Sequence, residues 1–92
     1  MAHCPFDRLR GLDPVFREIR TWPDIQEPRP GVFYVRRTAF LHFHINKEDH
    51  RWADARAGAE WGPPIDIPIG YSPAARSRFL REVRRRYEAT RA

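Results

Sequence analysis

Residues 38–45 read Thr-Ala-Phe-Leu-His-Phe-His-Ile, and residues 51–57 read Arg-Trp-Ala-Asp-Ala-Arg-Ala. Successive side chains of a β-strand point to opposite faces, so the odd positions 39–45 of the first segment and 53–57 of the second form apolar rows. The polar stretch at 46–49 is typical of a turn. The two segments are therefore predicted to be neighbouring antiparallel strands with one apolar face.

The apolar rows stay together when Phe43 lies beside Ala53. This register places His42 opposite Asp54 and His44 opposite Trp52. A shift by one residue would carry Asp54 into the core face without a partner, which is costly. Alternation and the cost of burying a charge thus predict one pairing.

Further strands and connectors are predicted on both sides of this pair. Residues 32–35 are β-branched and aromatic, and Arg36-Arg37 joins them to the strand at 38–45 by a tight connection. Residues 23–31 contain three prolines and are predicted to form an extended loop. Gly58–Pro64 is a turn-rich connector. Residues 65–69 alternate as an edge strand, because Pro68 cannot donate to a ladder.

Two helical segments flank the strands. Apolar residues between 6 and 21 have helical spacing, with a break near Gly11, and Asp13-Pro14 is typical of an N-cap followed by the first helical residue. Ser72-Pro73 predicts a second helix that runs to about residue 90. Its apolar stripe consists of Phe79, Leu80, Val83 and Tyr87.

The predicted fold class is α+β. A three- to four-stranded antiparallel meander (32–69) is flanked by an N-terminal helical segment (6–21) and a C-terminal helix (72–90), in one domain spanning 1–92. Both helices would cover the same face of the sheet in a two-layer arrangement, which leaves the other face open.

Composition limits the function. Residues 72–92 contain seven arginines and two glutamates, whereas residues 1–71 contain ten basic and ten acidic side chains, so the net charge of +5 comes from the C-terminal segment. No apolar run is long enough to span a membrane, and the N-terminus lacks the apolar region of a secretory signal. Cys4 is the single cysteine and gives no sign of an oxidising compartment, so a cytoplasmic protein is expected.

The open sheet face is the first candidate site. The ligand-binding candidates on it are Phe40, His42, His44, Trp52, Asp54 and Arg56. Two imidazoles on one side of a strand can also chelate a metal, with Asp54 or His50 as further ligands, and a divalent metal there would support hydrolysis. The alternative is a solvated face stabilised by cross-strand pairs. No cofactor is otherwise predicted, and no nucleophile lies in a catalytic setting.

Two other surfaces are candidates. The C-terminal helix presents Arg78, Arg81, Arg84 and Arg85, which could contact the phosphates of a nucleic acid, or could simply form a solvated basic face. Trp22, Trp61 and Phe40 are not assigned to the predicted core. With an edge strand they could form a homodimer or protein-partner interface, or they could cap the core from the loops.

The segment Gly31–His44, followed by Trp52–Arg56 and an arginine-rich helix, resembles a group of short bacterial proteins of unknown function built around a Phe-Leu-His-Phe-His strand. More distantly, His42 and His44 are similar to the His-x-His strand of the luciferase-like domain family, which is also a small α+β domain. The closer resemblance covers residues 31–92 and implies a bacterial cytosolic protein. The closer group has no known activity and implies no chemistry. The luciferase-like similarity implies none either, because the glycine-flanked histidine pattern of that family is absent.

The sequence thus predicts a non-enzymatic binding or protein-interaction module that uses the His/Trp/Asp sheet face. The alternatives are a metal-dependent enzyme centred on His42, His44 and Asp54, and nucleic-acid binding through the C-terminal helix.

Overall fold

The fold is built on two long neighbouring strands, β3 (Thr38–Ile45) and β4 (Arg51–Ala57). The computed structural model describes residues 12–46, 48, 50–67 and 72–91. β3 and β4 pair antiparallel with Phe43 beside Ala53, His42 beside Asp54 and His44 beside Trp52. The predicted register is confirmed.

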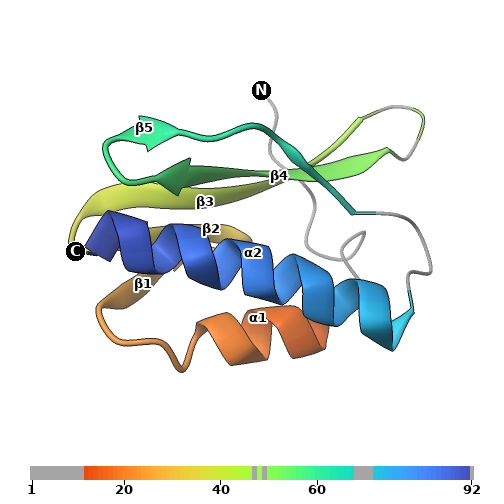
Figure 1. Cartoon of the computed structure of the whole chain (residues 1–92), viewed down its shortest axis with the longest axis horizontal. Helices are drawn as coiled ribbons and strands as arrows, with labels where there is room; N and C mark the ends of the chain where they lie inside the picture. The colour runs from red at the N-terminus through yellow and green to blue at the C-terminus, as the bar shows by residue number, and fades with distance from the viewer. Residues whose placement is uncertain (1–11, 47, 49, 68–71, 92) are drawn as a thin grey trace.

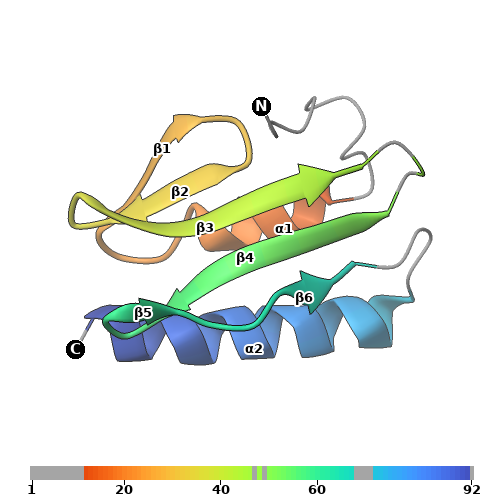
Figure 2. The same cartoon turned by 90° about the horizontal axis from the view of Figure 1, so that it is seen from above.

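The described strands form one antiparallel sheet. The order is β1 (Ile25–Arg29), β2 (Val32–Val35), β3, β4 and β5 (Glu60–Trp61), and β6 (Ile65–Asp66) pairs with the other end of β4. Two helices, α1 (Asp13–Ile19) and α2 (Pro73–Arg91), lie on the same side of this sheet (Figure 1). Seen from above, α1 lies beneath β2 and β3, and α2 runs beneath the β4, β5 and β6 side (Figure 2). The predicted two-layer α+β arrangement is confirmed.

The start of each helix tests the predicted caps. α2 begins as predicted, because the Ser72 side-chain oxygen accepts a hydrogen bond from the Ala75 backbone N–H at 3.1 Å. For α1 the predicted cap is wrong: Leu12 holds the N-cap position without a side-chain hydrogen bond, and Asp13 lies inside the first turn. There its carboxylate stabilises the positive end of the helix. The predicted helical residues 6–11 and the strand residues Pro68 and Ile69 lie outside the described part.

Two connectors predicted as loops contain short strands. Ile25–Arg29 pairs with β2 at the edge of the sheet, where Pro28 is tolerated because an edge strand bonds on one side only. The pairing is irregular between Gln26 and Arg29. Glu60 and Trp61 likewise pair with Ala57 and Arg56.

Phe40 was predicted on the open face and lies in the core instead. Phe33 pairs with Leu41 and Tyr34 with Ala39, so Phe40 has no partner in β2 and forms a β-bulge. The bulge turns its side chain to the helix side, where it is fully buried with its ring centroid 6.1 Å from that of Tyr87. The tight connection after β2 is confirmed, since Arg36 and Arg37 both have positive φ, 50° and 73°.

The core lies between the sheet and the helices. It includes the predicted stripe residues Phe79, Val83 and Tyr87, and also Trp22, which is 5% exposed. Trp22, in the turn after α1, and Phe40 therefore belong to the core and are not exposed for a partner, whereas Trp61, at 44%, is the exposed large apolar side chain of the described residues. None of the described helices has the length and apolar composition needed to cross a membrane.

Candidate functional site

The sheet face opposite the helices carries most of the predicted site residues. No helix or strand of the described residues covers this face (Figures 1 and 2). We call it the open face, and it is defined by the side chains of Tyr34, His42, His44, Trp52, Asp54, Arg56 and Trp61, with His50 and Asp66 at one end.

Three rings are stacked at the end of the open face near the turn after β3. The Trp52 ring stacks with the rings of His44, at 5.1 Å between ring centroids, and of His50, at 5.3 Å. Each histidine faces a carboxylate: His44 Nε2 lies 3.1 Å from Asp54 Oδ2, and His50 Nε2 lies 2.9 Å from Asp66 Oδ1. Trp52 thus stacks with two histidines, His44 from the neighbouring strand and His50 from the residues just before β4.

A second ring cluster lies at the β5 side. The Trp61 ring meets His42 edge-on at 5.5 Å, and the Arg56 guanidinium lies over the same indole at 4.8 Å. Arg56 Nε donates to the Ala39 carbonyl at 2.7 Å, and its Nη1 donates to the Ala59 carbonyl at 3.0 Å. Arg56 is therefore held in place by two carbonyls, and it retains its full positive charge.

Several imidazole nitrogens of this face lack a hydrogen-bond partner among the described residues. His42 Nε2 and both ring nitrogens of His44 are shielded from solvent and make no hydrogen bond within the described part of the chain. His44 Nε2 is close to Asp54, but the angle is unsuitable for a hydrogen bond. Burial, chiefly, and the neighbouring His44 lower the pKa of His42, an effect that Asp54 opposes. His42 is thus held neutral near pH 7.

The predicted metal set is not assembled. The rings of His42 and His44 are 6.2 Å apart and tilted by 45°, and His44 is fixed against Trp52. His50 is turned to Asp66 and stacks on Trp52. Within residues 12–46, 48, 50–67 and 72–91, no three His, Cys, Asp or Glu side chains are placed to hold a metal ion.

The structure also adds residues to the predicted site. Trp61 was placed in a connector, because two-residue strands leave no periodic signal in a sequence. Tyr34 was missed because the alternation of residues 32–35 did not reveal which side is open. His42 was predicted opposite Asp54, and the register is right, yet the close contact of Asp54 is with the diagonal neighbour His44.

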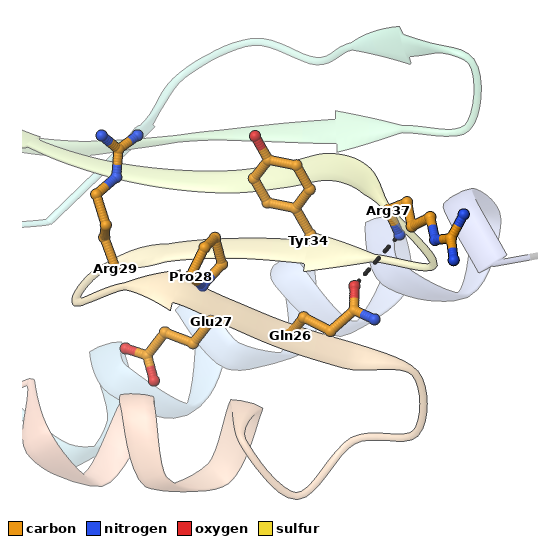
Figure 3. A pocket seen from close by; sticks show the side chains of 6 residues that line it. All are labelled: Gln26, Glu27, Pro28, Arg29, Tyr34 and Arg37. Carbon is orange, nitrogen blue, oxygen red and sulfur yellow. Dashed lines mark hydrogen bonds between the residues drawn. The ribbon is translucent and has the colours of Figure 1, made fainter.

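A shallow pocket extends the open face over β1 and β2. Its volume is about 590 Å³. Figure 3 shows the Tyr34, Pro28 and Arg29 side chains rising from the sheet away from the helices, whereas Glu27 points toward the helix layer. Gln26 Oε1 accepts a hydrogen bond from the Arg37 backbone N–H at 3.3 Å, which closes one end of the pocket. This pocket is not predictable from the sequence pattern, which indicates a loop over residues 23–31.

Four of the seven arginines of α2 are engaged with acidic side chains. Arg84 pairs with Glu88 at 2.9 Å, Arg85 and Arg86 pair with Glu82, and Arg91 pairs with Asp24 at 3.1 Å. Of the predicted nucleic-acid contacts, Arg78 and Arg81 make no ion pair with a described residue, whereas Arg84 and Arg85 do. The helix is thus a weaker anion-binding surface than its composition indicates.

Comparison of this chain with protein-family models, with curated proteins and with solved structures finds no match. The similarity to the luciferase-like domain family stays a prediction. The function is therefore proposed from the geometry of the open face.

Proposed function

We propose that this chain is a small binding module that holds its ligand on the open face. One observation carries the proposal: on a face without helical cover, the rings of His42 and His44 have shielded nitrogens with no hydrogen-bond partner in the described residues. Buried polar atoms in proteins are nearly always satisfied, so those left over point to a group that the protein alone does not supply. The exposed indole of Trp61 lies beside them.

The same surface supports binding better than catalysis. A histidine next to a carboxylate, as in His44 and Asp54, is the usual base and its orienting group. However, none of the side chains that define the open face is a serine, threonine, cysteine or lysine nucleophile. Aromatic rings and arginine, in contrast, are the side chains that dominate recognition surfaces.

The three tryptophans provide a direct test. Trp52 and Trp61 belong to the open face, whereas Trp22 is buried near α2, so the three indole N–H signals in a ¹H–¹⁵N spectrum report on both sides of the sheet. The ¹⁵N-labelled full chain is titrated with uridine monophosphate, N-acetyltryptophan amide and dodecauridylate.

The proposal predicts that at least one probe shifts the Trp61 and His42 signals saturably while the Trp22 signal stays in place. Trp61→Ala should weaken that binding, because it removes exposed ring area without opening the core. If all three probes leave the open-face signals unchanged, or shift only Trp22 and α2, the proposal is wrong.

A further inference from the structure

Two aromatic side chains of the open face lie in one row across the sheet. Tyr34 pairs with Ala39, the Ala39 carbonyl accepts the Arg56 guanidinium, and Arg56 pairs with Trp61 on β5. Three strand spacings separate β2 from β5, which is about 14 Å. The row therefore runs from Tyr34 over the small side chain of Ala39 and the flat guanidinium of Arg56 to Trp61.

Cations accompany both ends of this row. Arg29 and Arg37 line the pocket around Tyr34 (Figure 3), and their side chains make no ion pair or hydrogen bond with another described residue. Arg56 lies against Trp61 and is held by carbonyl oxygens rather than carboxylates. The carboxylates of the face, Asp54 and Asp66, lie next to His44 and His50 at the other end.

Resting on the proposed binding function, we infer that the open face binds a single-stranded nucleic acid. Its bases stack on Tyr34 and Trp61, and its phosphates contact Arg29, Arg37 and Arg56. Rings spaced along a positively charged surface are the usual way in which proteins hold single strands, because each base offers a flat face and each phosphate a negative charge.

The geometry favours a strand over a single nucleotide or a duplex. The pocket at Tyr34 is shallow, whereas pockets for small ligands enclose most of the ligand surface. Two rings on strands that lie three strand spacings apart, each with its own arginine, suit a ligand that extends over several nucleotides. A duplex keeps its base faces stacked inside and is read by elements that enter a groove, whereas the open face is a sheet surface.

The test measures the affinity of the full chain for fluorescein-labelled dodecauridylate and dodecathymidylate by fluorescence anisotropy between 50 and 200 mM salt. A duplex of the same length and unlabelled uridine monophosphate serve as competitors. With about three phosphates neutralised, the affinity should fall about twenty-fold over this range, since a single strand gives a slope of about −0.7 per phosphate.

Matched variants locate the binding surface. Arg29→Gln/Arg37→Gln should reduce the salt slope by about 1.4 units, whereas Arg78→Gln/Arg81→Gln, which removes two charges from the exposed side of α2, should leave the slope unchanged. Trp61→Ala, and Trp61→Leu as a second variant that keeps apolar bulk, should each weaken binding about ten-fold through the loss of stacking. All substituted positions are exposed, and urea unfolding checks that each variant folds.

The remaining outcomes of these measurements would contradict the single-strand assignment, the binding function or both. If neither oligonucleotide binds at 50 mM salt while N-acetyltryptophan amide shifts the Trp61 signal, the inference is wrong and the binding module stands. If no probe shifts the open-face signals, both are wrong. Loss of binding in the α2 variant alone, equal affinity for uridine monophosphate, or preference for the duplex would each overturn the single-strand assignment.

Discussion

Replacing Arg86 with methionine tests how α2 is joined to the sheet. Arg86 is 5% exposed, although its neighbours Arg84 and Arg85 reach solvent. Its Nε donates to Glu82 at 2.8 Å, and its Nη1 donates to the carbonyls of Pro63 at 2.8 Å and Ala55 at 3.2 Å. One guanidinium thus connects the helix, β4 and the connector before β6.

The cost of Arg86→Met follows from which partners lose their bond. Ala55 keeps the Gly62 N–H at 2.9 Å, and Glu82 keeps Arg85, so the Pro63 carbonyl loses its donor. Hydrogen bonds to a charged group contribute about 1.5–3 kcal/mol each, and methionine recovers part of this through apolar burial. We expect a loss of about 3 kcal/mol in the free energy of unfolding, or roughly 12–24 °C in Tm for a domain of this size.

Urea unfolding followed by tryptophan fluorescence measures this change. Arg81→Met, at an exposed position of the same helix, is the control and should stay within about 0.5 kcal/mol of the wild type. Arg86→Lys keeps the charge but not the fork of donors, so its stability should lie between the two. If Arg86→Met is as stable as Arg81→Met, the buried guanidinium does not connect these elements as described.

Three further changes probe the same structure. Gly62→Ala places a Cβ 2.8 Å from Arg86 Nη1 and 3.3 Å from the Ala55 carbonyl, so we expect a loss of about 1–3 kcal/mol on urea unfolding, and an unchanged midpoint would contradict the close approach. Phe40→Ala should cost about 3–5 kcal/mol because the ring is in the core, whereas a side chain on the open face would cost less than about 0.5 kcal/mol. The pKa of His42 is lowered from its ordinary value of 6.5, so the unfolded state binds more protons and stability should fall as the pH drops below 6.5. His42→Gln should show a smaller fall between pH 7.5 and 5, and parallel curves for the two proteins would argue against a neutral, buried imidazole.

The register of β3 and β4 was predictable because two independent costs favour it. Alternation places the apolar side chains of both strands on one face, and a shift by one residue would carry Asp54 into the core. Most of the open face follows from this single pairing, since His42, His44, Trp52 and Asp54 all belong to it. The start of α2 was equally predictable, because Ser72 and Pro73 specify a helix start locally.

The parts that were missed depend on strand pairing and contacts that the pattern within one segment does not reveal. The bulge at Phe40 arises where β2 and β3 leave the turn at Arg36 and Arg37, and alternation alone assigns the ring to the wrong face. β1 contains Pro28 and no periodic pattern, so only its pairing with β2 makes it a strand. Arg86 is one of seven arginines on its helix, and its sequence neighbours do not show that a carbonyl from β4 will receive it.

The distribution of charge over the chain favours the open face over α2 as the ligand-binding surface. The net charge of +5 comes from the C-terminal segment, yet four of its seven arginines are already engaged: Arg84, Arg85 and Arg91 pair with acidic side chains, and Arg86 is buried against the sheet. The open face has fewer cations, but Arg29 and Arg37 make no ion pair with a described residue, and Arg56 is held by neutral carbonyls. An arginine that is already paired with a carboxylate gains little from a second anion. An unpaired arginine beside an aromatic ring offers a ligand both a charge contact and a stacking surface. Binding should therefore depend on the local arrangement of the arginines rather than on their number. A chain whose excess positive charge lies in one helix can therefore bind its ligand through residues 1–71, which carry no net charge.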